Sequence, residues 1–345
     1  MKALVKPKPE PGLELIDQPI PSPGPSDILV KIHASAICGS DIKIKRWDPV
    51  MQNLIRTLPV IPGHECAGEV IEVGNNVSKV KTGDRVAAET HIPCRKCNQC
   101  LRGRLHTCDN MQLFGHTIDG CFADYALFPE SATWKLPVEL SYDLGCLLEP
   151  MGIPYRAVER AKIYNEPVVV LGCGPIGQFA IAFSHLQTAK PLIAVDTNPL
   201  RLNIAKQMGA DFCLNPHDVQ VTESIRDITS SSRNVAVIIE ASGNVKAFQE
   251  LLPTLRAGGK AMVLGQSKDN LLLSVSPDIV LRELELVGFY GRLLWDTWEK
   301  TQDILQTGLI DVTPVITNRY RLADFNKAFQ EAEMGNGCKV LFVSD

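Results

Sequence analysis

The sequence predicts an α/β protein in which a β-rich segment precedes a doubly wound, mainly parallel sheet. Apolar strands alternate with helices after about residue 150, and a Gly-x-Gly-x-x-Gly turn directly follows one of these strands. In the first third of the chain, short strands are separated by glycine and proline, which is typical of a compact, barrel-like β unit. The 345 residues suffice for two domains.

Three stretches in the first third have the pattern of strands. They are the apolar run Ile28–Ile32, the alternating run Gly68–Gly74 and the segment Asp84–Ala87, which follows a Thr-Gly turn. Their shortness and the turn residues between them predict the β-rich unit.

The remaining elements follow in order. A helix is predicted over Tyr155–Lys162, and strands and helices then alternate. The predicted strands are Pro167–Leu171, Leu192–Asp196, Val235–Glu240, Gly259–Leu264 and Leu284–Phe289. The predicted helices between them include Ile176–Leu186 and Pro199–Met208. The last stretch contains helices Trp295–Gln306 and Ala323–Met334 and a strand Lys339–Val343, which the pattern alone does not place.

The composition excludes several classes of protein. With 45% apolar and 21% charged residues, the chain is not disordered, collagen-like or coiled-coil. A net charge of −4 provides no positive field for nucleic acid or an anionic membrane. No apolar run reaches the roughly 18 residues of a membrane span, and the N-terminus lacks a signal-peptide core. We therefore expect a soluble, cytoplasmic protein with neither nucleic-acid nor membrane partners.

Four of the eleven cysteines form a cluster in the sequence, separated by two, two and seven residues: Cys94, Cys97, Cys100 and Cys108. In a reducing compartment such a cluster favours metal over disulfides. Four thiolates close a tetrahedral site, which predicts a structural zinc ion.

The glycine turn predicts a dinucleotide-binding site. It follows the strand ending at Leu171 and opens a helix, and Asp196 ends the next strand, as expected where a carboxylate binds the adenosine ribose. This carboxylate repels a 2′-phosphate, so we expect NAD rather than NADP. The candidate cofactor-binding residues are Gly172, Gly174, Pro175, Ile176, Gly177, Asp196, Arg201 and Leu264.

A second zinc site is predicted from separate motifs. Cys38, His64, Glu65 and Glu149 supply a thiolate, an imidazole and two carboxylates, and this set can bind zinc while leaving a position open for a substrate oxygen. Ser40, two positions after Cys38, is placed to accept an alcohol proton. A cleft between the two domains is the expected place for such a site.

Taken together, these motifs and their order resemble the zinc-dependent medium-chain dehydrogenase/reductase superfamily. The resemblance implies a GroES-like catalytic domain over residues 1–150 with a structural zinc lobe, a Rossmann NAD-binding domain over 151–290, and a return segment 291–345 that completes the catalytic domain. It implies an NAD-dependent alcohol dehydrogenase with two zinc ions per chain, a small-molecule alcohol substrate and a homo-oligomer, either dimer or tetramer.

Within this superfamily, three stretches resemble the L-threonine 3-dehydrogenase subfamily. They are Glu89–Cys94, the run from Phe289 to Trp298 and Pro314–Thr317. The resemblance implies oxidation of L-threonine to 2-amino-3-oxobutanoate by hydride transfer to NAD. The site must then bind an ammonium, through Glu149 or Glu65, and a carboxylate, through His91.

Two departures from the subfamily keep an alternative open. Lys43 stands where the subfamily carries a proton-relay histidine, and Ile153-Pro154 replace Asn-Ala. The alternative is a polyol or other secondary-alcohol dehydrogenase. A catalytically silent NAD-binding structural protein is less favoured, because Cys38, Ser40 and His64 are all present.

Overall fold

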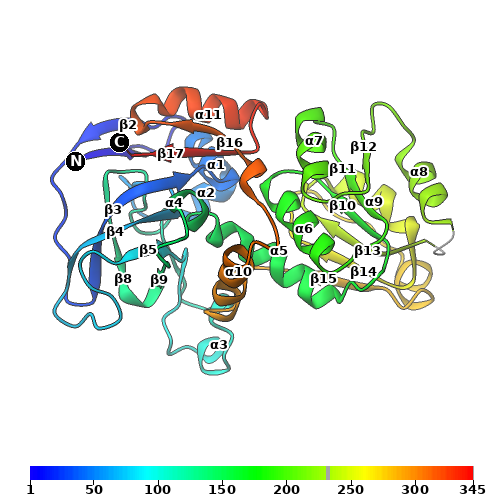
Figure 1. Cartoon of the computed structure of the whole chain (residues 1–345), viewed down its shortest axis with the longest axis horizontal. Helices are drawn as coiled ribbons and strands as arrows, with labels where there is room; N and C mark the ends of the chain where they lie inside the picture. Colours follow the sequence, from blue (N-terminus) through cyan, green and yellow to red (C-terminus); the bar gives the residue numbers. More distant parts are fainter. Residues whose placement is uncertain (231–233, 345) are drawn as a thin grey trace. The chain divides into compact units, whose positions relative to one another are not determined.

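The computed structural model describes residues 1–230 and 234–344. The chain divides into two compact units (Figure 1). Unit 1 comprises residues 1–149, 293–302 and 316 onward, and unit 2 comprises 150–292 and 303–315. Residues 303–315 therefore belong to unit 2, whereas the sequence had assigned the whole segment 291–345 to the catalytic domain.

Unit 1 is built on a seven-stranded mixed sheet. Its strand order is β16-β17-β3-β4-β5-β9, and β8 also pairs with β3. The bounds are β3 (Asp27–Ala36), β4 (Glu65–Val73), β5 (Arg85–Ala88), β8 (Tyr125–Pro129), β9 (Thr133–Lys135), β16 (Ile316–Tyr320) and β17 (Lys339–Val343). β3 is twice as long as the predicted Ile28–Ile32, since its ten residues pair with β4, β8 and β17.

Smaller elements complete unit 1. Two two-stranded sheets join β1 (Lys2–Val5) to β2 (Glu14–Asp17) and β6 (His91–Ile92) to β7 (Gln112–Leu113). The helices are α1 (Gly39–Arg46), α2 (Pro49–Leu54), α3 (Asn98–Leu101), α4 (Tyr142–Gly145) and α11 (Phe325–Met334). One apolar core lies among these elements and includes Phe114, Phe122 and Phe329.

Unit 2 is built on a six-stranded parallel sheet, as the sequence predicts. The strand order is β12-β11-β10-β13-β14-β15. The bounds are β10 (Val168–Leu171), β11 (Leu192–Val195), β12 (Phe212–Leu214), β13 (Val235–Glu240), β14 (Leu255–Val263) and β15 (Glu285–Gly288). The chain reverses direction across the sheet between β10 and β13, and ligands bind at such switch points in doubly wound sheets.

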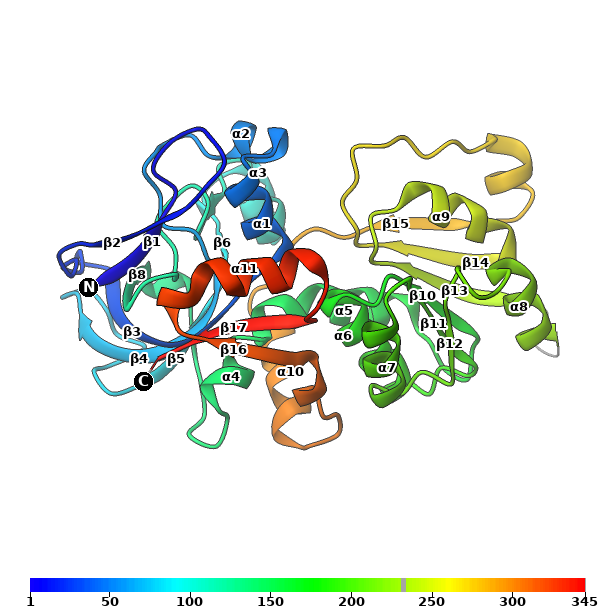
Figure 2. The ribbon, with the colours of Figure 1, turned by 90° about the horizontal axis from the view of Figure 1, so that it is seen from above.

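Helices cover both faces of this sheet. α6 (Pro175–Leu186) and α7 (Pro199–Gln207) lie on one face and α9 (Val245–Leu251) on the other (Figure 2). Unit 2 also contains α8 (Val221–Ile228) and a π-helix over Val275–Val280, whereas α5 (Leu148–Ala161) and α10 (Asp296–Gln306) each contain residues of both units. α5 begins seven residues before the predicted Tyr155, and β12 was not predicted.

Among the described residues, the structure contains no helix that combines the length and the apolar character needed to cross a membrane.

Candidate functional site

Unit 1 contains a lobe in which four thiols converge. The sulfur atoms of Cys94, Cys97, Cys100 and Cys108 all lie within 4.8 Å of one another. Backbone N–H groups point at them: Cys108 Sγ accepts hydrogen bonds from Cys94 N at 3.2 Å and Asn110 N at 3.3 Å. The backbone N–H of Lys96 helps to lower the pKa of Cys94 to about 6. Four converging sulfurs with one easily ionised thiol fit a closed zinc site.

A second cluster forms where three strands of the large sheet end. Antiparallel pairing of β3 with β4 places Ala36 opposite Glu65, so that Cys38 comes next to His64. The ligand atoms of Cys38, His64 and Glu65 lie within 4.8 Å of one another. A thiol, an imidazole and a carboxylate at this spacing fit a zinc ion with an open position.

Asp41 fixes the orientation of this cluster. It is fully buried in the first turn of α1, accepts a hydrogen bond from Cys38 N at 2.8 Å and lies 3.6 Å from His64 Nδ1. Although burial opposes it, the charge of Asp41 raises the pKa of His64 well above its usual value. With Nδ1 turned to Asp41, Nε2 is the histidine nitrogen left for a metal.

Lys339 also belongs to this cluster, and no sequence motif predicts it there. β17 pairs with β3 on the side opposite β4, and Lys339 Nζ lies 2.6 Å from Glu65 Oε2. Both side chains are almost fully buried. Despite burial, which lowers it, the Glu65 carboxylate raises the pKa of Lys339. A lone lysine in a C-terminal strand carries no motif.

Ser40 and Glu149 lie outside the three-residue group. Ser40 Oγ is buried and has no hydrogen-bond partner in the part of the chain that the structure describes, which suits a group that would bind substrate. Glu149 is buried and accepts a hydrogen bond from the Thr90 hydroxyl. The Glu149 carboxylate, which the sequence predicts as a fourth ligand, is therefore hydrogen-bonded to Thr90, the residue before His91.

His91 is held by a buried carboxylate. Glu89 is fully buried and lies 3.1 Å from His91 Nδ1, and it also accepts a hydrogen bond from His91 N at 2.8 Å. Its other oxygen accepts a hydrogen bond from Trp298 Nε1 at 2.7 Å. Trp298 is almost fully buried.

A further histidine, His116, lies beside His64, and no sequence motif predicts it there. Its ring is buried, 4.8 Å from the ring of His64 between centroids. Burial and the charge of His64 lower the pKa of His116 to about 4. In the sequence it is a single histidine after a glycine, which is indistinguishable from a structural residue.

The glycine turn of unit 2 has the conformation expected of a phosphate-binding loop. Gly172 has φ of +88°, and a Cβ there would meet Ser242 at 2.7 Å. A Cβ on Gly177 would overlap the Gly172 carbonyl oxygen, whereas one on Gly174 would meet nothing within 4 Å. Gly174 caps α6, with Pro175 at its first position, so open space lies in front of a helix N-terminus.

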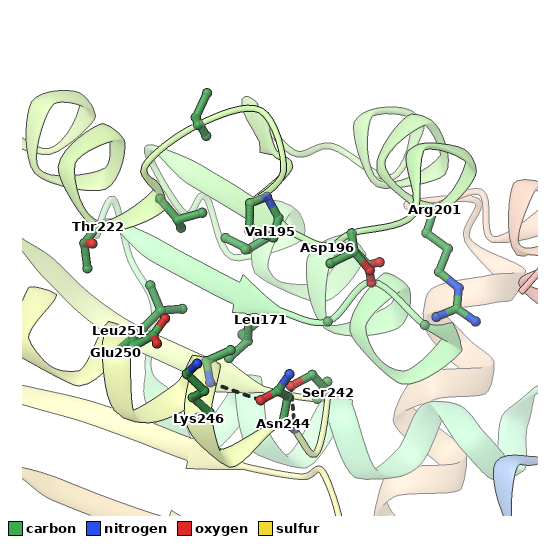
Figure 3. A pocket seen from close by; sticks show the side chains of 18 of the residues that line it. Leu171, Val195, Asp196, Arg201, Thr222, Ser242, Asn244, Lys246, Glu250 and Leu251 are labelled. Atoms are coloured by element: carbon green, nitrogen blue, oxygen red, sulfur yellow. Dashed lines mark hydrogen bonds between the residues drawn. The ribbon is translucent and has the colours of Figure 1, made fainter.

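A pocket of about 570 Å³ opens along this turn (Figure 3). It lies at the ends of the neighbouring strands β10, β11 and β13. The residues that line it include Gly172, Gly174, Asp196, Arg201 and Ser242. Its volume is within the range of ligand pockets. The sequence did not single out the wall formed by Ser242, Asn244 and Lys246, which lies beyond β13.

Asp196 is ordered by the turn that it faces. Its carboxylate accepts hydrogen bonds from Cys173 N at 2.6 Å and Asn198 N at 2.8 Å. Arg201, on α7, borders the same pocket, and its Nε is buried and without a partner among the described residues. Leu264 follows β14 and is not part of this pocket's lining.

The residues that depart from the subfamily pattern lie on two helices. Lys43 is half-buried on α1, and Ile153 and Pro154 are on α5, where Pro154 is buried. On the same helix, a Cβ on Gly152 would meet Arg292 Cγ at 2.5 Å. Arg292 is buried against α5.

Comparisons with known proteins agree with this geometry. Residues 24–138 match the model of the alcohol dehydrogenase GroES-like domain, and residues 175–307 match that of the zinc-binding dehydrogenase. The chain is 38% identical to L-threonine 3-dehydrogenase of Pyrococcus furiosus over 99% of this chain and 98% of that protein.

Solved structures share the fold. A protein described as a short chain alcohol dehydrogenase of Escherichia coli CFT073, complexed with NADH, superposes with a TM-score of 0.90 at 26% identity, covering 100% of this chain and 99% of that one. A zinc-binding dehydrogenase of Sinorhizobium meliloti 1021 bound to NADP gives 0.91 at 27% identity, covering 99% of each chain. With its GroES-like and Rossmann parts, its zinc-type donor sets and these relatives, the chain belongs to the zinc-dependent medium-chain dehydrogenase/reductase superfamily and is an NAD-dependent alcohol dehydrogenase.

Proposed function

We propose that this enzyme oxidises L-threonine at its 3-hydroxyl to 2-amino-3-oxobutanoate, with transfer of hydride to NAD⁺. The observation that carries the proposal is the full-length identity to L-threonine 3-dehydrogenase of P. furiosus. The buried His91 in the Glu-Thr-His segment, held by Glu89, supports it further.

In this proposal the two donor sets hold two zinc ions. Cys94, Cys97, Cys100 and Cys108 hold a structural ion, and Cys38, His64 and a carboxylate hold the second. Zinc bound at the second set supplies a Lewis acid that lowers the pKa of a hydroxyl group beside it. The Ser40 hydroxyl would accept the substrate proton while donating its own onward, and NAD⁺ bound to unit 2 would supply the hydride acceptor.

Recognition of an amino acid requires groups for an ammonium and a carboxylate. Of the two candidates for the ammonium, Glu149 is favoured over Glu65, because Lys339 already neutralises Glu65 at 2.6 Å. Glu149 is buried and accepts a hydrogen bond from the Thr90 hydroxyl, in the same segment as His91. His91 is proposed to contact the substrate carboxylate.

Unit 2 is proposed to bind NAD in preference to NADP. The pyrophosphate would lie against the N-terminus of α6 at Gly174, and the adenosine ribose would bind Asp196. The carboxylate of Asp196 repels a 2′-phosphate. Pro175, Ile176 and Gly177 shape the turn.

A homo-oligomer is proposed from an uncovered edge of unit 2. β15 is the last strand of the six-stranded sheet, and large apolar side chains around it are exposed: Leu272, Val275, Val280, Leu281, Leu286 and Tyr290. An apolar sheet edge of this kind pairs readily with another chain. A second copy offers the same edge, and two-fold symmetry would pair β15 with itself.

The test is an assay of NADH release with L-threonine, polyols and simple secondary alcohols, with zinc counted in the same preparation. We expect turnover of L-threonine and two zinc ions per chain. Rapid oxidation of a polyol or simple secondary alcohol without any of L-threonine would favour the alternative, to which Lys43 and Ile153-Pro154 point. In that case, restoring His at 43 and Asn-Ala at 153–154 should raise threonine turnover.

A further inference from the structure

His116 reaches the candidate zinc cluster because its loop packs backbone against backbone on the segment before His64. Gly115 has φ of +75°, and a Cβ there would lie 2.3 Å from the Gly63 carbonyl oxygen. The same oxygen accepts a hydrogen bond from Cys121 N at 2.9 Å. A side chain at position 115 would push the loop away, so this close approach holds His116 beside His64.

The hydrogen bond of His116 defines which of its nitrogens carries the proton. Nδ1 lies 3.1 Å from the Phe114 carbonyl oxygen. Since a carbonyl only accepts, Nδ1–H must donate, and in the neutral ring Nε2 has a free lone pair. Within residues 1–230 and 234–344, Nε2 has no hydrogen-bond partner. It is also not among the polar atoms there that are both fully buried and unpartnered, so it retains some exposure.

His116 lies outside the second group of candidate ligands. The ligand atoms of that group, Cys38, His64 and Glu65, lie within 4.8 Å of one another. The His116 ring nevertheless lies 4.8 Å from that of His64. A substrate whose reacting oxygen is held next to His64 therefore brings the substituent on its next carbon toward His116.

We propose that His116 is a specificity-determining residue, whose Nε2 accepts a hydrogen bond from an ammonium or hydroxyl group on the carbon next to the reacting hydroxyl. The inference rests on the proposed function and deepens it. A buried acceptor made for such a donor discriminates against analogues that lack it, because the acceptor is then left unpaired. The enzyme thus prefers vicinal amino alcohols or diols to simple secondary alcohols.

The experiment compares two substrate pairs that differ only in this donor. L-Threonine and (R)-3-hydroxybutanoate differ in the ammonium, and 2,3-butanediol and 2-butanol differ in the second hydroxyl. We would measure kcat/KM for each, and the Kd of L-threonine and (R)-3-hydroxybutanoate by calorimetry on the zinc-loaded protein with NADH. The variants are His116→Leu, which removes the acceptor, and His116→Gln, which retains one.

In the parent enzyme, we expect the donor-bearing member of at least one pair to be favoured by roughly ten- to a hundred-fold in kcat/KM and Kd. His116→Leu should reduce that preference to within a few-fold, and His116→Gln should restore part of it. His33→Leu, a half-buried imidazole of the same unit that stacks on Tyr142, is the control and should leave the ratios unchanged.

Equal losses for both members of each pair in His116→Leu would overturn the inference and indicate a purely structural role. A parent enzyme that shows no preference within either pair, in turnover or in binding, would also overturn it. Failure of the proposed function has a different signature: L-threonine is ignored while 2,3-butanediol is oxidised. In that case the diol pair alone decides whether His116 recognises a neighbouring donor.

Discussion

The indole N–H of Trp298 donates a hydrogen bond of 2.7 Å to the buried carboxylate of Glu89, 209 positions away in the chain. The same carboxylate accepts a hydrogen bond from the backbone N–H of His91. A residue of the C-terminal segment therefore completes the support of a candidate substrate-binding histidine. The position of His91 therefore depends both on its neighbour Glu89 and on Trp298, far away in the chain.

Replacing Trp298 by Phe should destabilise unit 1 by about 1–3 kcal/mol, because one oxygen of a fully buried carboxylate loses its partner. Urea denaturation of the zinc-loaded protein measures the loss. Trp134→Phe is the matched control: its indole donates to the neutral Gln302 side chain at 2.8 Å in a partly exposed place, so its loss should be smaller. Equal losses would argue against the buried charge as the cause.

Lys339→Met should cost about 3–5 kcal/mol of stability, since it leaves the Glu65 carboxylate buried without its cation. The double variant Glu65→Gln/Lys339→Met should recover part of that loss. As a control, Lys135→Met breaks a pair of similar length with Asp84 at an exposed place and should cost less than about 1 kcal/mol. A loss no larger than that of the control would show that the buried pair does not stabilise the fold.

Cys97→Ser should remove one of the two zinc ions and lower the unfolding temperature, because the lobe has no strand or long helix to hold it without metal. NAD affinity should stay within about twofold, since the dinucleotide pocket is lined entirely by residues of unit 2. Metal analysis and NAD titration test both parts. Retention of two zinc ions by the variant would refute the ligand role of Cys97.

Asp196→Asn should reduce the preference for NAD over NADP by roughly ten- to a hundred-fold, because it removes the charge that repels a 2′-phosphate while keeping an acceptor for Cys173 N. The ratio of kcat/KM for the two cofactors is the measurement. Asp218→Ala, an exposed aspartate outside the pocket lining, should leave the ratio unchanged. A parent enzyme that uses NADP as well as NAD would contradict the role given to Asp196.

Stability should increase with pH through a window below pH 6.5 because of His33. Burial lowers the pKa of His33 below 6.5, and the positive charges of Lys31 and Arg85 lower it further. The negative charge of Glu69 opposes this shift without cancelling it. The unfolded chain then binds more protons than the folded one in this window, so folding weakens as the pH falls through it. His33→Phe, which retains a ring against Tyr142, should flatten this slope in denaturation measured from pH 5 to 8. An unchanged slope would show that other groups cause it.

Features that depend on residues close together in the chain could be predicted from the sequence. The parallel sheet of unit 2 was predictable because its buried strands are continuous apolar runs, and the Cys94–Cys108 lobe because its four cysteines lie within fifteen positions. The turn from Gly172 to Gly177 was predictable because its glycines meet steric requirements within the turn and with one neighbouring loop.

Tertiary structure decided what depends on strand register and on close backbone contacts. The pairing of β3 with β4 and β17 brings Lys339 to Glu65, and no spacing in the sequence encodes that contact. Likewise, Trp298 reaches Glu89, and His116 reaches His64, only once the sheet and its loops have formed. The donor types and the local motifs follow from the residues themselves, whereas folding sets which donors meet. Side chains far apart in the chain come together only through the pairing of strands and the packing of loops.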